Sequence, residues 1–480
     1  MAEILIRQFD LLALRIAMDL SGDEPQVGMK LQGRTKGNLD LFAEWTIAAP
    51  TIGLPERLDR SETAYQGYPF TFPQNVLQGI REVLAQSDYQ ERPLWLHLAK
   101  PLGYLNLVPW EELLQPALQM PILRVPDFLA NPPRETVQSL EVALCGSVPV
   151  AKAAFTAVDH LAGMAERLLD TVPRQTTVHI FCDADLFPGV SQRVAAMGLQ
   201  SVTVHDPADA ESFAPADRQY ALTDHSKRVR NPWLLWMRKA LSGRSIDMVQ
   251  FLTHGYISRD AGALAFAESP LKNQDARAAR FVGAPELLAF FNHVGAWCAA
   301  FSSPEHNYSE LGLRLLADTV AQLRPGPVLH HELRLDADGT ALADAYRFLF
   351  GRASAPPPRS PAIFAYCHPS LLEALAPAPA ARARRGVGAR PGAAAAPAHP
   401  DDLIRDLYQQ AESVPSWLGS SQRYLEQRRR DVQQMKQQYE TVGTRRVTSR
   451  IDKAQVIEDT LRQIEKTLGN VLAKRSRGGD

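Results

Sequence analysis

Short apolar runs, each about as long as one strand, recur between residues 140 and 372, and amphipathic stretches separate them. The runs that read as buried strands are residues 140–145, 177–182, 201–205, 246–253, 288–297, 327–333 and 362–367. After the first run, one face of a predicted helix carries Phe155, Val158, Leu161, Ala165 and Leu168. Apolar strands that alternate with helices are typical of a mostly parallel sheet covered on both faces. We therefore expect an α/β fold here.

The first 70 residues have a different pattern. Short stretches of alternating polarity are separated by turns near residues 19–26 and 33–38. This pattern favours a small β-rich N-terminal region, to which the sequence assigns no function. We assign residues 71–375 to the α/β domain that follows.

Residues 376–400 contain no large apolar side chain except valine, several Pro and Gly residues, and only basic charges. Such a segment cannot bury enough surface to offset its ordering entropy. We predict a flexible linker that separates the α/β domain from the last 80 residues.

Residues 401–480 have helical periodicity. Residues 424–439 carry one apolar stripe, and a second stripe has alternating spacings of four and three residues. The second stripe consists of Ile457, Leu461, Ile464, Leu468 and Val471. Heptad spacing with charges between favours a helical hairpin or a short coiled coil. The two helices would pack on one another, or else mediate self-association or the binding of a regulatory partner.

The composition is that of an ordinary globular protein, with 45% hydrophobic and 22% charged residues. The formal net charge of −1 gives no reason to expect a nucleic acid or an anionic membrane as a partner. The four cysteines are scattered without a C-x-x-C pair, which favours reduced thiols and a cytoplasmic location. The N-terminal stretch carries charges that a signal peptide would lack.

Two predicted strands run directly into reactive side chains. Residues 246–253 lead into His254-Gly255, and residues 288–297 lead into Cys298. Ligands of open α/β sheets bind at the carboxyl ends of the strands. If the two strands are neighbours, an imidazole and a thiol would meet at this edge.

A Cys–His pair at such an edge would support nucleophilic catalysis. The imidazole would take the thiol proton or stabilise the thiolate, which is the reactive form of cysteine. The backbone N–H groups of Gly255 and Cys298 would then form an oxyanion hole. The alternative is structural, because cysteine is among the residues most often buried in a core.

Several motifs support the catalytic interpretation through a resemblance. Residues 251–256 (FLTHGY) and 262–266 (GALAF) resemble the strand-His-Gly signature and the next hairpin of the CHAT family of caspase-like cysteine peptidases. Residues 284–288 (APELL), before Cys298, resemble its short helix and catalytic strand, and Pro109-Trp110-Glu111 resembles its "PWE" motif. The likeness covers residues 70–375. It implies a caspase-like sheet with His254 as the base and Cys298 as the nucleophile.

The resemblance further implies a cysteine endopeptidase that cleaves a specific partner protein in a bacterial regulatory, antiviral or cell-death system. The family often has a small or acidic residue before the cysteine, whereas Trp297 stands here. A catalytically inactive caspase-like scaffold that recruits a partner through its helical tail is therefore an alternative. An acyl-transfer enzyme that acts on a non-peptide substrate is another.

The remaining candidates are weaker. Asp183 and Asp185 follow a predicted strand and would line the substrate crevice with Trp297, or would cap a helix. The run His330-His331-Glu332 lacks a second ligand pair at zinc-finger spacing, so we expect no metal. Neither a Walker A loop nor a G-x-G-x-x-G motif follows a strand, so we expect no nucleotide cofactor.

Overall fold

The computed structural model of the chain describes residues 2–19, 24–35, 38–54, 70–85, 89, 92–99, 105–129, 139–148, 156–213, 229–258, 261–271, 279–304, 310–351 and 355–373. The chain divides into two compact units, Met1–Ala381 and Arg382–Asp480, and every described residue belongs to the first. The predicted linker and the predicted helical tail lie outside the described residues.

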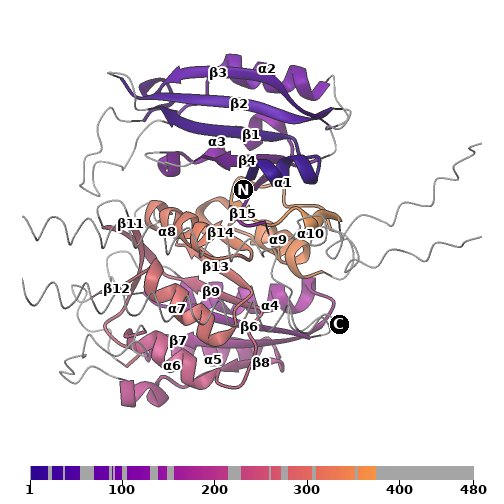
Figure 1. The fold of residues 1–480 in the computed structure, drawn as a ribbon. Helices are drawn as coiled ribbons and strands as arrows, with labels where there is room; N and C mark the ends of the chain where they lie inside the picture. The colour runs from indigo at the N-terminus through magenta and orange to yellow at the C-terminus, as the bar shows by residue number, and fades with distance from the viewer. Residues whose placement is uncertain are drawn as a thin grey trace, which may run out of the picture. The chain divides into compact units, whose positions relative to one another are not determined.

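The described part is a mixed α/β structure (Figure 1). Its strands are β1 (Ala13–Asp19), β2 (Gln26–Thr35), β3 (Asn38–Ala48), β4 (Leu94–Leu98), β5 (Ile122–Arg124), β6 (Ser139–Gly146), β7 (Gln175–Cys182), β8 (Val202–Val204), β9 (Met248–Leu252), β10 (His254–Ser258), β11 (Ala261–Phe266), β12 (Arg280–Gly283), β13 (Cys298–Ser303), β14 (Val328–Glu332) and β15 (Ile363–Tyr366). Its α-helices are α1 (Ala2–Gln8), α2 (Gln74–Ala85), α3 (Trp110–Leu118), α4 (Ala157–Thr171), α5 (Phe187–Ala196), α6 (Pro232–Ala240), α7 (Ala284–Val294), α8 (Glu310–Leu323), α9 (Thr340–Phe350) and α10 (Ser370–Glu373). Short 3₁₀ turns include η1 (Ala49–Ile52), η3 (Leu105–Leu107), η5 (Pro207–Phe213) and η7 (Leu333–Leu335).

Twelve of the described strands form one large sheet in the order β3-β2-β1-β4-β5-β15-β14-β13-β9-β6-β7-β8. From β14 to β8 all neighbours are parallel, so their carboxyl ends share one edge of the sheet. The predicted mostly parallel sheet is therefore confirmed. The N-terminal strands β1 to β3 pair antiparallel with one another, and β1 pairs with β4 in parallel, so the sheet continues across residue 70.

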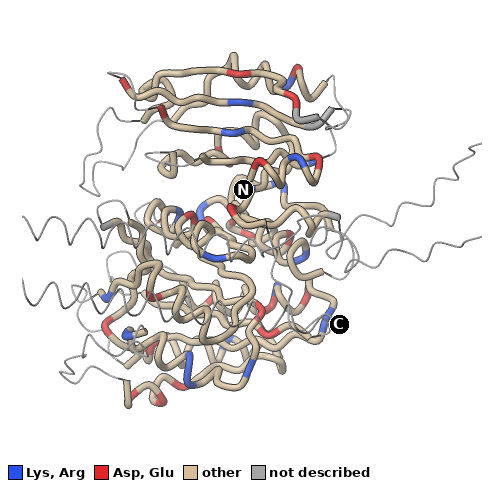
Figure 2. Tube along the Cα trace, in the orientation of Figure 1, with Lys and Arg blue, Asp and Glu red and all other residues tan. Residues whose placement is uncertain are grey.

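Helices cover both faces of the parallel block. Apolar side chains of α4, α5 and α9 pack on one face, and those of α6, α7 and α8 pack on the other. A third cluster lies between strands β1 to β4 and α2 and α3. Acidic and basic positions are interspersed along the described chain, as Figure 2 shows, in keeping with the near-zero formal net charge.

The two halves of the large sheet meet at β5 and β15, where a single residue pair, Arg124 and Tyr366, is in register. Side chains reinforce this joint. Arg124 is 1% exposed and makes a two-pronged pair with Glu111, with both N–O distances 2.8 Å, and a further pair with Asp318 at 2.7 Å. The guanidinium also lies 4.1 Å from the ring centre of Phe364. Glu111 of the Pro-Trp-Glu motif is thus part of a buried ion-pair group at the joint.

One predicted strand is wrong. Residues 284–294 form the helix α7, and the neighbouring strand β13 begins only at Cys298. Pro285 stands in the first turn, Glu286 faces the positive end of the helix dipole, and Gly295 ends the helix at φ 65°. These are helix start and stop signals. A short apolar run is compatible with a strand or a buried helix, and the end signals decide between them.

Candidate active site at the carboxyl edge of the sheet

Six parallel strands end at the same edge of the large sheet. The five longest of them end at Gly146, Cys182, Leu252, Ser303 and Glu332, and the short strand β8 ends at Val204. Ligands of open α/β sheets bind beyond this edge. The side chains at and just after these positions are therefore the first candidates for chemistry.

His254 stands two residues beyond the end of β9, close to the position that the sequence predicts, and begins the three-stranded sheet β10-β11-β12. It is 5% exposed. This small sheet lies against α8 at a very close approach, because a Cβ atom on Gly312 would come within 2.9 Å of the Gly255 carbonyl carbon. Gly255 and Gly312 therefore permit the backbone packing that positions His254.

Cys298 lies at the other edge of the sheet. It is the first residue of β13 and is in register with Met248, the first residue of β9. Met248 precedes His254 by six residues, about 20 Å along an extended chain. The predicted His254–Cys298 dyad is therefore wrong. Because the preceding residues form a helix instead of a strand, the cysteine begins β13 instead of following its end.

The surroundings of Cys298 agree with a structural role. The residue is 0% exposed, and burial raises the pKa of its thiol to about 12, although Arg324 acts in the opposite direction. The thiol is therefore protonated at neutral pH. Its backbone N–H donates to the Asp247 carbonyl at 2.7 Å, so this N–H is not available for the predicted oxyanion hole.

Two serines, Ser302 and Ser303, occupy the strand end at which the sequence had suggested a cysteine. Ser302 is in register with Leu252, so Ser303 lies beside Thr253. Ser303 is therefore adjacent to the residue that directly precedes His254. All four cysteines of the chain are among the described residues, and none stands at this strand end. The sequence signal for these serines is the apolar run Ala299–Phe301 that stops at Ser-Ser-Pro.

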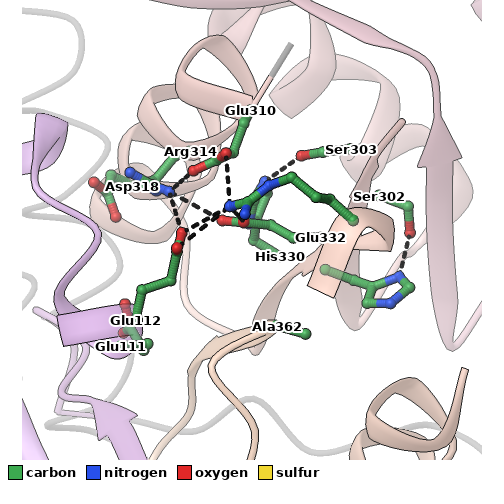
Figure 3. Close-up of polar contacts among 12 residues, drawn as sticks. Glu111, Glu112, Ser302, Ser303, Glu310, Arg314, Asp318, His330, Glu332 and Ala362 are labelled. Atoms are coloured by element: carbon green, nitrogen blue, oxygen red, sulfur yellow. Dashed lines mark hydrogen bonds and ion pairs between the residues drawn. The ribbon is translucent and has the colours of Figure 1, made fainter. Parts of the chain in front are cut away.

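Ser303 is hydrogen-bonded to an imidazole. Its Oγ atom lies 2.8 Å from Nε2 of His330, on the neighbouring strand β14 (Figure 3). His330 is fully buried and stacks on Phe364 with a centroid distance of 4.7 Å. Burial, together with Arg314, His331 and Arg124, lowers the pKa of His330 well below its ordinary value. The ring is thus neutral, and Nε2 can accept the serine proton.

The other ring nitrogen of His330 faces a carboxylate. Nδ1 lies 4.0 Å from Oε1 of Glu332 and has no hydrogen-bond partner among the described residues. The three side chains Ser303, His330 and Glu332 are thus aligned as nucleophile, base and acidic group, with the last distance longer than a hydrogen bond.

Ser302 points to the opposite face of the sheet and belongs to a second network. Its Oγ accepts from Nε2 of Gln250 at 2.8 Å and lies 3.3 Å from Nδ1 of His331. Nε2 of His331 donates to Asp336 at 3.0 Å, and Tyr346 donates to Gln250 at 2.5 Å. Because a carboxylate only accepts, Nε2 of His331 carries a proton that points to Asp336.

Three carboxylates near Glu332 have the spacing of a metal site. Glu112, Glu310 and Glu332 offer oxygens within 4.8 Å of one another. Two guanidinium groups already pair with them. Arg314 contacts Glu310 and lies 2.9 Å from Glu332, and Arg334 lies 3.2 Å from Glu112 and 3.3 Å from Glu332. The cluster is therefore an ion-pair network, part of which Figure 3 shows.

Asp183 follows β7 at the carboxyl edge, as predicted. It is 1% exposed, and its Oδ1 accepts the N–H of Leu186 at 3.0 Å, just before α5. Burial raises the pKa of Asp183 to about 6, although the hydrogen bond from Leu186 lowers it. This contact favours the capping interpretation. Asp185 is exposed.

Trp297 does not lie in a crevice at the carboxyl edge. It directly precedes β13 at the amino end, and its ring packs on Phe350 with a centroid distance of 6.0 Å. The prediction that Trp297 lines the substrate crevice is therefore wrong, because residues 284–294 form a helix and Trp297 precedes β13 instead of ending a strand.

Comparison of the chain with protein-family models, curated proteins and solved structures found no match. The resemblance to the CHAT family therefore rests on the motifs alone. Among the described residues, no helix combines the length and the apolar character needed to span a bilayer.

Proposed function

We propose that the chain is a caspase-like peptidase in which the hydroxyl of Ser303, instead of a cysteine thiol, is the nucleophile. The single observation that carries the proposal is the 2.8 Å contact between Ser303 Oγ and Nε2 of a neutral His330. A nucleophile and a base within hydrogen-bonding distance, with a third group behind the base, are the signature of nucleophilic catalysis.

The position of Ser303 supports the same proposal. The CHAT resemblance implies a histidine at the exit of one strand and a nucleophile at the exit of its neighbour. His254 follows β9, and Ser303 ends the adjacent strand β13. The cleaved bond would be a peptide bond in a partner protein, as the resemblance implies.

The proposed reaction has two steps. Ser303 Oγ attacks the peptide carbonyl while its proton passes to Nε2 of His330, and the resulting imidazolium protonates the leaving amine as the C–N bond breaks. Water then attacks the acyl ester, which releases the carboxylic acid and returns the proton to Ser303. His254, at the neighbouring strand end, would contact the substrate.

A fluorophosphonate probe, which reacts with activated serines, tests this proposal on the full-length chain. Wild type and Cys298→Ala should be labelled, whereas Ser303→Ala and His330→Ala should not. Ser302→Ala is the matched control, because it makes the same change one residue away on the other face of the sheet. Equal labelling of Ser303→Ala and wild type would rule out this nucleophile.

The second candidate function is a catalytically inactive caspase-like scaffold. The near-complete burial of the pair favours it, since Ser303 is 2% and His330 0% exposed. A folded wild type that neither reacts with the probe nor cleaves any co-expressed protein would support this candidate. Its proposed recruiting element, residues 401–480, lies outside the described residues. Co-purification with and without that segment would test its role.

A further inference from the structure

Glu332 connects the Ser303–His330 pair to the N-terminal part of the chain. It ends β14, two residues after His330, and its side chain is 5% exposed. Its Oε1 lies 4.0 Å from Nδ1 of His330 and 2.9 Å from Arg314 of α8. Its Oε2 lies 3.3 Å from Arg334, which in turn pairs with Glu112 of α3 at 3.2 Å.

Nδ1 of His330 is a buried ring nitrogen that finds no hydrogen-bond partner within the described part of the chain, and Glu332 is the carboxylate that faces it. A buried polar atom left without a partner is energetically unfavourable. A shift of about 1 Å would bring Glu332 Oε1 within hydrogen-bonding distance of Nδ1. That bond would fix the proton on Nδ1 and leave Nε2 free to accept from Ser303.

We propose that Glu332 is the positioning residue that fixes the reactive tautomer of His330, and that Glu112 of α3 tunes Glu332 through Arg334 and Arg314. The proposal rests on the proposed function of Ser303 and His330. It makes the helix α3 part of the control of the candidate site, beyond its packing against the sheet.

The charged groups around Glu332 determine at which pH its carboxyl group ionises and can accept a strong hydrogen bond from His330. Burial raises the pKa of Glu332 to about 7, Arg314 and Arg334 lower it, and Glu112 and Glu111 raise it. The charged or titratable groups that face it are Glu111 and Glu112 from α3, Glu310 and Arg314 from α8, Arg334 from η7, and His330 from its own strand. Below about pH 7 the carboxyl is protonated and accepts weakly. Above that pH the carboxylate accepts from His330 Nδ1–H.

The test is the rate of fluorophosphonate labelling of the full-length chain between pH 5.5 and 9. In wild type the rate should rise with pH, with a midpoint near 7. Glu332→Gln should lower the rate about tenfold or more and remove this step, since the base loses its orienting carboxylate. Glu112→Gln should shift the midpoint to lower pH, because one charge that raises the pKa of Glu332 is gone. Glu82→Gln, on the exposed side of α2, is the matched control and should change nothing.

An unchanged pH profile in Glu332→Gln would overturn the proposal. If that variant does not fold, Glu112→Gln keeps the test, because its side chain is 26% exposed and an unshifted midpoint would count against the coupling. If the wild type is not labelled at all, the proposed function fails, and the positioning role is then read separately from the imidazole ¹⁵N chemical shifts of His330. These should report a proton on Nδ1 in wild type and a changed tautomer in Glu332→Gln. Identical shifts would refute the positioning role.

Discussion

The two adjacent serines at the end of β13 differ in how completely their partners are satisfied. On the α9 side, Ser302, Gln250, Tyr346, His331 and Asp336 form a closed network, and none of the five has a buried side-chain atom without a partner. On the α8 side, Ser303 and His330 are hydrogen-bonded, but no described residue is a hydrogen-bond partner of His330 Nδ1. A buried network in which every donor and acceptor is hydrogen-bonded stabilises one structure. In an incomplete network, a small movement can form the missing hydrogen bond. The Ser302 network therefore has a structural role, whereas the proposed chemistry belongs to the Ser303 side.

The largest expected effect on stability is that of Asp336→Asn. Asp336 accepts from Nε2 of His331 and from the backbone N–H groups of Ala341 and Leu342 in the first turn of α9. Replacing the carboxylate should cost about 3 kcal/mol of unfolding free energy, because the hydrogen bonds are buried and charge-assisted. Urea unfolding at pH 7 measures it. Asp344→Asn, at a side chain of α9 that is 45% exposed, should cost no more than about 0.5 kcal/mol, and an equal loss in both variants would refute the assignment.

The lowered pKa of Asp336 predicts that part of the free energy of unfolding is lost in acid. Burial raises the pKa of Asp336, but the bonds from His331, Ala341 and Leu342 outweigh it and lower the pKa from 3.8 to about 2. A group whose pKa falls on folding stabilises the native state above its unfolded pKa and loses this contribution as the pH falls. Wild-type stability should therefore drop between pH 4 and 2, and Asp336→Asn should lack this part of the drop in urea titrations. A parallel drop in both proteins would contradict it.

Replacing either serine by alanine should lower the free energy of unfolding by an intermediate amount, and the loss should differ between the two. Ser302→Ala leaves both Gln250 Nε2 and His331 Nδ1 without this partner and should cost about 2 kcal/mol, whereas Ser303→Ala affects only His330 and should cost about 1 kcal/mol. Thermal unfolding of the two variants checks this order. A greater loss in Ser303→Ala would mean that the structural roles are reversed.

Tyr346→Phe removes one hydroxyl from the closed network and leaves its packing in place. The lost bond to Gln250 Oε1 should cost about 1 kcal/mol. Fluorophosphonate labelling of Ser303 should not change, since Tyr346 lies on the other side of the sheet. Chemical denaturation of the variant measures its stability, and labelling of the same sample measures the reactivity of Ser303. A folded variant that is no longer labelled would show that the Ser302 network affects Ser303.

The smallest effect is expected at Cys298. Its buried thiol, with a pKa raised to about 12, should resist iodoacetamide in the native protein at pH 7.5 and react only after unfolding. Cys298→Ala should leave fluorophosphonate labelling unchanged. Rapid native alkylation at Cys298, detected by peptide mass, would restore the cysteine as a candidate nucleophile.

The sequence predicts the mostly parallel sheet from its repeated short apolar runs, and it predicts the position of His254 because the run 246–253 ends directly before His254-Gly255. It fails at residues 288–297, where Leu287 to Phe291 is too short an apolar run to separate a strand from a buried helix. That one error placed Cys298 at the carboxyl end of a strand, whereas Cys298 is the first residue of β13. His330 was considered only as a metal ligand, because the pairing of β13 with β14 that brings it to Ser303 is a tertiary property.

The joint at β5 and β15 has a consequence for synthesis of the chain on the ribosome. β15 (Ile363–Tyr366) is the last described strand, yet it lies between β5 and β14 and joins the two halves of the sheet. Strands β1 to β5 leave the ribosome first, and the parallel block follows, but neither half can be joined through β15 until residue 366 has emerged. At about 5–20 residues per second, the N-terminal half waits on the order of 10–50 s with one sheet edge uncovered. A nascent chain stalled before β15 should therefore be the form that chaperones bind most strongly.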